Sequence, residues 1–89
     1  MKLADDTLED VIARLRRIEG QIGGIIRMVE SERECRDVVR QISAASKALD
    51  QVGFKILASG LRLCVSDARA AKKAGYTEDE LEKLFLQLS

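Results

Sequence analysis

Apolar residues recur at alternating intervals of three and four positions through most of this chain, and that spacing favours long amphipathic helices packed in a bundle or coiled coil. Asp6 and Glu9 have the spacing of a capping box, so the first helix is predicted to begin beside them. Its apolar pattern consists of Leu8, Val11, Leu15, Ile18, Ile22, Ile25 and Val29.

A second and longer pattern follows the first. Ser31 and Glu34 have S-x-x-E spacing, which predicts the start of a helix. Lys72 and Lys73, with Gly75 just beyond them, are stop signals, so we expect one helix of about 40 residues between the two sets of signals. The pattern on this helix consists of Cys35, Val38, Ile42, Ala45, Leu49, Val52, Ile56, Ser59 and Leu63.

Thr77 and Glu80 form a third capping-box pair, which opens a short helix at the end of the chain. The sequence contains no proline and no tryptophan. We therefore predict an all-α domain over residues 1–89 with three helices, two long and one short. Aromatic residues make up only 3% of the chain, so its core must be aliphatic and thin, and we expect it to oligomerise.

Both cysteines, Cys35 and Cys64, fall within the predicted long helix. At a rise of about 1.5 Å per residue their Cα atoms would lie about 43 Å apart. A disulfide needs Cα atoms within ~7 Å, so the two thiols of one chain cannot meet. An antiparallel second copy that crosses at Leu49–Asp50, midway between them, would place Cys35 of one chain opposite Cys64 of the other, and the two-fold axis would generate a second such pair.

The charge and apolar content of the chain limit the partners and the cellular compartment that we expect for it. The net charge is zero, from 15 basic and 15 acidic residues. The ends are acidic and the middle is basic, so a basic face remains available to a polyanion. No apolar signal segment and no run near the ~20 residues needed to cross a membrane is visible, so we expect a cytoplasmic protein with no membrane partner. In that compartment the cysteines are expected to be reduced thiols.

Two motifs at different places in the chain point to a family. They are RLRRIEGQI at residues 14–22, and CRDVVRQI at residues 35–42 with Ala44, Ala45, Ala48 and Leu49 behind it. In order and spacing they resemble the first-helix and second-helix signatures of the copper-sensitive operon repressor (CsoR) family of bacterial transcription regulators. The resemblance extends over nearly the whole chain.

The resemblance implies a homodimer in which the first two helices of each subunit form an antiparallel four-helix bundle, and a homotetramer built as a dimer of dimers. It also implies a repressor of operator DNA with a sensing site between subunits. In that family the site uses a second-helix cysteine of one chain and residues near the second cysteine of the other. Here these positions are Cys35 and Cys64, the pair that the antiparallel geometry brings together.

Departures from the family pattern limit the classes of inducer that we expect for this chain. Copper sensors of the family have a histidine four residues before the second cysteine, where this chain has Gly60. Nickel and cobalt sensors need further histidines, and this chain has none. Formaldehyde sensors have proline after the initiator methionine, where this chain has Lys2. The remaining dithiol resembles that of the CsoR-like sulfurtransferase repressors, which respond to persulfides and polysulfides.

We therefore predict a repressor that is released when inorganic polysulfide or a low-molecular-weight persulfide links Cys35 to Cys64 of the neighbouring subunit. Arg36 and Arg62 lie near the thiols and favour this chemistry, although Glu34 and Asp37 oppose them. This prediction needs no metal or other cofactor.

The principal alternative is a Cu(I)-responsive repressor in which the same two thiolates bind the soft ion, although no third ligand is evident. Zinc would require four ligands. A further alternative is a non-sensing paralogue that pairs with another family member, since a buried cysteine also packs as a small apolar residue. The chain has no nucleophile elbow, phosphate-binding loop or histidine, so we predict that it is not an enzyme.

Basic and polar side chains on the two long helices are the candidates for DNA contacts. In the family such faces bind phosphates without a helix-turn-helix, which implies steep salt dependence and some reliance on DNA shape. Many members have a basic residue where this chain has Gly23, so one contact is missing or moved. The candidates are Arg14, Arg17 and Gln21 on one face of the first helix, Arg16 on the other side of its pattern, and Arg40 and Lys47 on the second helix.

Overall fold

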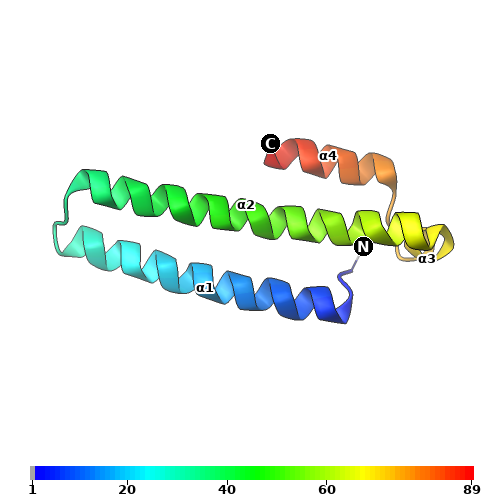
Figure 1. Ribbon diagram of the computed structural model, residues 1–89, viewed down its shortest axis with the longest axis horizontal. Helices are drawn as coiled ribbons and strands as arrows, with labels where there is room; N and C mark the ends of the chain where they lie inside the picture. The colour runs from blue at the N-terminus through cyan, green and yellow to red at the C-terminus, as the bar shows by residue number, and fades with distance from the viewer. Residues whose placement is uncertain (1) are drawn as a thin grey trace.

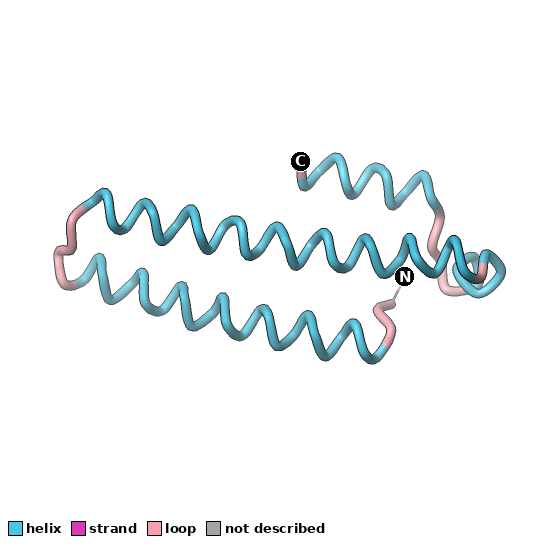
Figure 2. Tube along the Cα trace, viewed as in Figure 1, coloured by secondary structure: helices cyan, strands magenta, loops and turns pink. Residues whose placement is uncertain are grey.

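The computed structural model describes residues 2–89, and these residues form four helices and no strand (Figure 1). Helix α1 (Asp5–Glu30) and helix α2 (Cys35–Ser66) form a long antiparallel hairpin. After the short helix α3 (Ala68–Lys73), helix α4 (Glu78–Leu88) runs back along the opposite side of α2, and short loops join the elements (Figure 2). The all-α prediction is confirmed. None of these helices is long and apolar enough to span a bilayer.

The predicted helix of about 40 residues is wrong in one respect, because the chain breaks it at Asp67. The backbone of Asp67 is extended (φ −153°, ψ 87°), and its carboxylate accepts a hydrogen bond of 3.0 Å from the N–H of Ala70. An aspartate that caps the next helix competes with continuation of the previous one. Residues 2–89 therefore contain four helices rather than three, but Cys35 and Cys64 still belong to the same unbroken α2.

Of the three predicted helix caps, the one at α4 is confirmed and the other two are wrong. At α4, the hydroxyl of Thr77 accepts a hydrogen bond of 3.2 Å from the N–H of Glu80, as predicted. At α1, the residue before the helix is Ala4, which has no side-chain cap, so the predicted cap at Asp6 is wrong. The carboxylate of Asp6 lies inside the first turn and instead accepts from the N–H of Thr7.

The turn between α1 and α2 also differs from the prediction. Ser31 does not start α2 but ends α1, where its hydroxyl donates to the carbonyl oxygen of Arg27 at 2.8 Å. Glu34 precedes α2 and makes no side-chain capping bond. A serine followed by a glutamate three residues later thus served the end of one helix and not the start of the next.

The apolar pattern on each long helix is divided between two faces, and α1 and α2 cover only one face on each other. Val11 and Ile18 of α1 pack with Val52 of α2 in the core between the two helices. Alternate members of each pattern stay exposed, and half of the surface of Leu49 (50%) is open. We call these exposed members the apolar stripe; they are Leu8, Leu15, Ile22 and Val29 on α1 and Cys35, Ile42 and Leu49 on α2.

A second core lies between α2 and the C-terminal helices. Ala71, Tyr76 and Leu81 are buried there, and Cys64 packs against them. Gly60 of α2 faces this core, since a Cβ atom on it would lie 2.9 Å from the Tyr76 ring and 3.1 Å from Leu81. The missing side chain therefore allows the chain entering α4 to lie directly on α2.

The close approach at Gly60 leads to a stability prediction. A Gly60→Ala variant should lower the free energy of unfolding by about 1–3 kcal/mol, because the added methyl group must displace a buried ring. Gly20→Ala is the matched control, since a Cβ at Gly20 meets nothing within 4 Å and alanine favours a helix by up to ~1 kcal/mol. Urea denaturation of both variants measures the difference, and equal stability would contradict the packing described here.

Candidate functional site

Cys35 is the first residue of α2 and is exposed. It belongs to the apolar stripe, so it lies on the uncovered side of the helix hairpin. The charged side chains beside it pair with each other, Arg36 with Glu34 at 3.9 Å and Arg40 with Asp37 at 4.0 Å. These long, exposed contacts are weak. Cys35 is therefore an accessible thiol on an apolar surface with nearly balanced local charge.

Cys64 lies in the last turns of α2 and is partly buried. One side of it packs against the core formed by Ala71, Tyr76 and Leu81. A surface cavity of about 220 Å³ reaches it between α3 and α4, with Lys72 on its wall. The thiol thus remains accessible to a small reagent, and its modification would press directly on the packing of the C-terminal helices.

The two thiols of one chain lie far apart, as predicted. Both belong to a single helix without a break, so about 43 Å separates them at the α-helical rise. Each is a free cysteine in this structure. A site that uses both thiols therefore needs a second copy of the chain, and the pairing of Cys35 with Cys64 of that copy stays a prediction.

Within a single chain, residues 2–89 provide no cluster of three metal ligands: no three side chains of the histidine, cysteine, aspartate and glutamate types come together in a way that could hold a metal ion. Copper sensors of the resembling family have an imidazole at the position of Gly60, but here the Tyr76 ring and Leu81 fill the space beside it. A two-thiolate site shared between subunits would suit Cu(I), which accepts low coordination.

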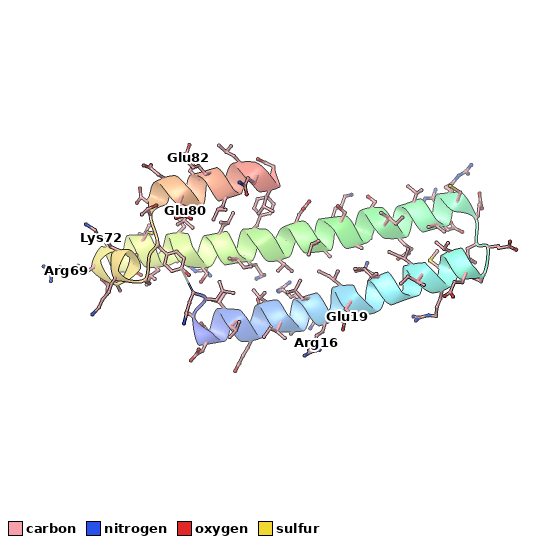
Figure 3. All side chains as sticks on the ribbon, turned by 180° about the vertical axis from the view of Figure 1, so that it is seen from behind. Arg16, Glu19, Arg69, Lys72, Glu80 and Glu82 are labelled. Carbon is pink, nitrogen blue, oxygen red and sulfur yellow. The ribbon has the colours of Figure 1, made fainter. Side chains whose placement is uncertain are left out.

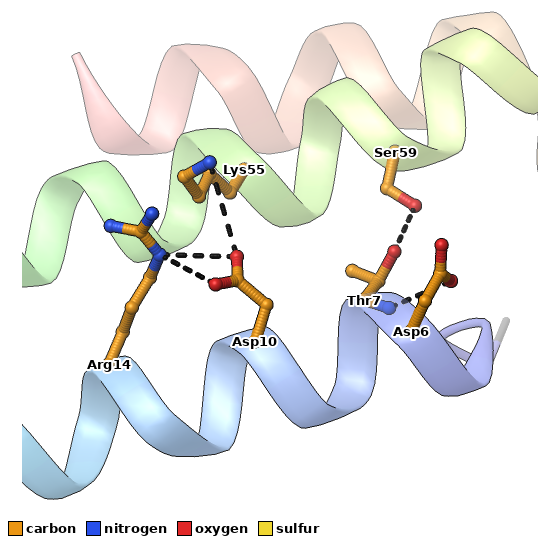
Figure 4. Close-up of polar contacts among 6 residues, drawn as sticks. All are labelled: Asp6, Thr7, Asp10, Arg14, Lys55 and Ser59. Atoms are coloured by element: carbon orange, nitrogen blue, oxygen red, sulfur yellow. Dashed lines mark hydrogen bonds and ion pairs between the residues drawn. The ribbon is translucent and has the colours of Figure 1, made fainter.

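The sequence pattern indicates a solvent-facing side chain for Arg14, whereas the structure places this side chain in an ion pair. It is only half-buried, on the flank where α1 meets α2, and its Nε atom donates to both carboxylate oxygens of Asp10 at 3.2 and 3.1 Å (Figure 4). The Nζ atom of Lys55, from α2, lies 4.0 Å from the same carboxylate. The sequence prediction missed Lys55, although it lies two helical turns beyond the candidate Lys47.

The remaining DNA candidates do not form one patch. Arg17 and Gln21 follow Arg14 along the same helix face, Arg17 exposed and Gln21 partly buried. Arg16 instead projects from the outer side of α1, near Glu19 (Figure 3). Figure 3 also places Arg69 and Lys72 at the α3 end of the molecule, and Lys72 lines the same cavity as Cys64. The sequence prediction did not include these two basic residues.

Comparisons with known proteins agree with the resemblance in the two motifs. The model of a family described as metal-sensitive transcriptional repressor matches residues 7–87. The copper-sensing transcriptional repressor RicR of Mycobacterium tuberculosis is 49% identical over 57 residues, which cover 64% of this chain and 59% of RicR. The copper-sensing transcriptional repressor CsoR of Bacillus subtilis is 40% identical over 76 residues, covering 85% of this chain and 72% of that repressor. No solved structure matches.

These relatives bear on the predicted inducer. Their names specify copper and none specifies a persulfide. The comparisons therefore favour the Cu(I) alternative over the persulfide prediction, although this chain has glycine, and no imidazole, at position 60.

A histidine introduced at Gly60 tests whether that space is closed. Gly60→His alone should lower the melting temperature and leave Cu(I) affinity unchanged, because Tyr76 occupies the space that the imidazole needs. Adding Tyr76→Ala should make room for the ring and raise Cu(I) affinity above that of the unaltered protein. Competition with a Cu(I) chelator measures both; a single variant that is stable and binds Cu(I) more tightly would contradict the packing argument.

Proposed function

Because the chain belongs to the family of metal-sensitive transcriptional repressors, we propose that it binds operator DNA and releases it when Cys35 and Cys64 are occupied together across a subunit interface. One observation supports this most strongly: the two thiols lie at opposite ends of an unbroken helix, one of them on an uncovered apolar surface. The members of this family are transcriptional repressors, so the chain is not an enzyme.

A second copy of the chain is the proposed cover for the apolar stripe. Continuous exposed apolar surface of this kind marks interfaces, and its burial is worth about 25 cal/mol per Å². Leu49, midway between the cysteines, is half exposed and lies at the proposed crossing point. An antiparallel four-helix-bundle dimer would bury it, and a dimer of dimers would present two such bundles to DNA in the cytoplasm.

Cu(I) is the first candidate inducer, because the relatives are named for copper sensing. Cys35 of one subunit and Cys64 of the other would hold it. A soft cation bound by two thiolates would bridge the subunits at both ends of the dimer. Binding that favours one arrangement of the bundle would change DNA affinity by a coupling of ~1–3 kcal/mol.

Sulfane sulfur is the second candidate, and the packing of Tyr76 over Gly60 favours it, since a dithiol without a third ligand suits sulfur chemistry. The Cys64 thiolate would attack a sulfane sulfur of a polysulfide, breaking an S–S bond and expelling a shorter sulfide with the electron pair. Cys35 of the second copy would then attack the sulfur of Cys64 and expel hydrosulfide. The two cysteines would lose two electrons in total, and the sulfane sulfur would gain them.

The proposed DNA contacts are phosphate contacts by side chains on the long helices. Arg14, Arg17 and Lys47 are the principal candidates, with Arg16, Gln21 and Arg40 as further ones. Arg14 and Lys55 lie beside the same carboxylate, so Lys55 joins the set. Such contacts release counterions, and the affinity should fall steeply as salt rises.

Titration with each inducer tests the proposal. Reduced protein should bind a duplex that it selects from a random-sequence pool, and an effective inducer should weaken that binding about 5–150-fold. Intact mass would show one Cu(I) per thiol pair, or a sulfur-linked dimer. Cys35→Ser and Cys64→Ser variants should fold and bind the same duplex without responding.

The outcomes separate the candidates. Loss of DNA binding with tightly bound Cu(I) and no covalent dimer supports the copper reading and excludes the sulfur one, and the reverse result does the opposite. A protein that selects no duplex, or whose DNA affinity ignores both reagents, would contradict the proposed function.

A further inference from the structure

Asp10 lies between two cations on different helices. Its carboxylate accepts from Nε of Arg14 at 3.2 and 3.1 Å, one turn further along α1, and Nζ of Lys55 on α2 lies 4.0 Å away (Figure 4). Arg14 and Lys55 each have no other ion pair among the described residues. One carboxylate therefore partly neutralises both cations, which would otherwise be free to bind a polyanion.

The hairpin brings the backbones of α1 and α2 side by side at these groups. One turn before Asp10, the hydroxyls of Thr7 and Ser59 are 3.0 Å apart in a hydrogen bond between α1 and α2 (Figure 4). This contact sets the register that brings Lys55 opposite Asp10. Asp10, Arg14 and Lys55 therefore lie together where α1 meets α2. Arg14 is one of the principal candidates for a DNA contact.

The geometry points to Asp10 as a competitor of DNA phosphate for Arg14 and Lys55, an inference that rests on the proposed function. Each side chain of the trio is between 33% and 48% exposed, so a phosphate oxygen can reach the cations from solvent. A guanidinium donates charge-assisted hydrogen bonds to phosphate oxygens as it does to carboxylate oxygens. DNA binding therefore exchanges one anion for another, and the carboxylate keeps the affinity below what the two cations alone would give.

A positioning role predicts the opposite effect. If Asp10 served to hold Arg14 in the orientation that DNA requires, removal of its charge would loosen Arg14 and weaken binding. If Asp10 competes, removal of its charge frees two cations and eliminates repulsion of nearby phosphates. Asparagine distinguishes the two roles, because it keeps the shape and one acceptor oxygen of aspartate but has no charge.

The test compares Asp10→Asn with Glu9→Gln, which removes the same charge from an exposed neighbouring residue for which the structure shows no ion pair. The duplex is one that the unaltered protein selects from a random-sequence pool. Asp10→Asn should bind it about three- to tenfold more tightly at low salt, with the gain shrinking as salt is added, and Glu9→Gln should bind it with little change. Most of the gain should vanish in an Asp10→Asn, Arg14→Ala double variant.

Each result decides the matter. Unchanged or weaker binding by Asp10→Asn, while the unaltered protein binds normally, would overturn the competition and leave the proposed function intact. An equal gain from Glu9→Gln would show that the effect comes from overall charge, and it would also overturn the competition. If the unaltered protein selects no duplex, the proposed function fails, and the role of Asp10 fails with it.

Discussion

An unbroken α2 holds Cys35 and Cys64 at opposite ends of a helix against which every other helix of the chain packs. One side of α2 contacts α1, another contacts α3 and α4, and the third side remains open and apolar. Because a helix of this length is stiff, neither thiol can reach the other within a chain. In the proposed antiparallel dimer, a second copy that covers the open side would also supply the second thiol.

The C-terminal helices pack on α2 beside one of the two thiols, Cys64. Gly60 lets Tyr76 lie on α2 one turn before Cys64, and the Tyr76 hydroxyl donates to the carbonyl oxygen of Lys2 at 2.6 Å. The same aromatic residue thus fills the place of a possible third ligand and ties the N-terminal segment to this end of the molecule. Under the proposed function, occupation of Cys64 would disturb the core that includes Tyr76, which bonds the segment before α1.

Much of the fold could be predicted from periodicity, because three-four spacing defines helices that pack in bundles. The break at Asp67 was not predicted, because a single aspartate within a strong helical pattern has no periodic signature and acts only through its own capping bond. The split of each apolar pattern between a covered and an uncovered face was not predicted. Sequence spacing cannot say which of two adjacent stripes a neighbour covers.

The candidate site was predictable in part. Cys35, Cys64 and the significance of Gly60 followed from sequence, but the reason that Gly60 is tolerated required Tyr76, which lies 16 positions later in the chain and packs on it only in three dimensions. The pairing of Arg14 with Asp10 was accessible from i, i+4 spacing, whereas the approach of Lys55 depends on the register between α1 and α2.

The most direct test of the account uses dimers that contain one Cys35→Ser chain and one Cys64→Ser chain, produced together with different tags. Such a dimer retains one complete pair, with Cys64 on the first chain and Cys35 on the second, whereas neither homodimer retains any. Polysulfide should link the two chains of the mixed dimer covalently and leave both homodimers unlinked. The antiparallel pairing on which the proposed function depends would be contradicted by equal linking in either homodimer. It would also be contradicted by a mixed dimer that neither forms a link nor binds Cu(I) more tightly than the homodimers do.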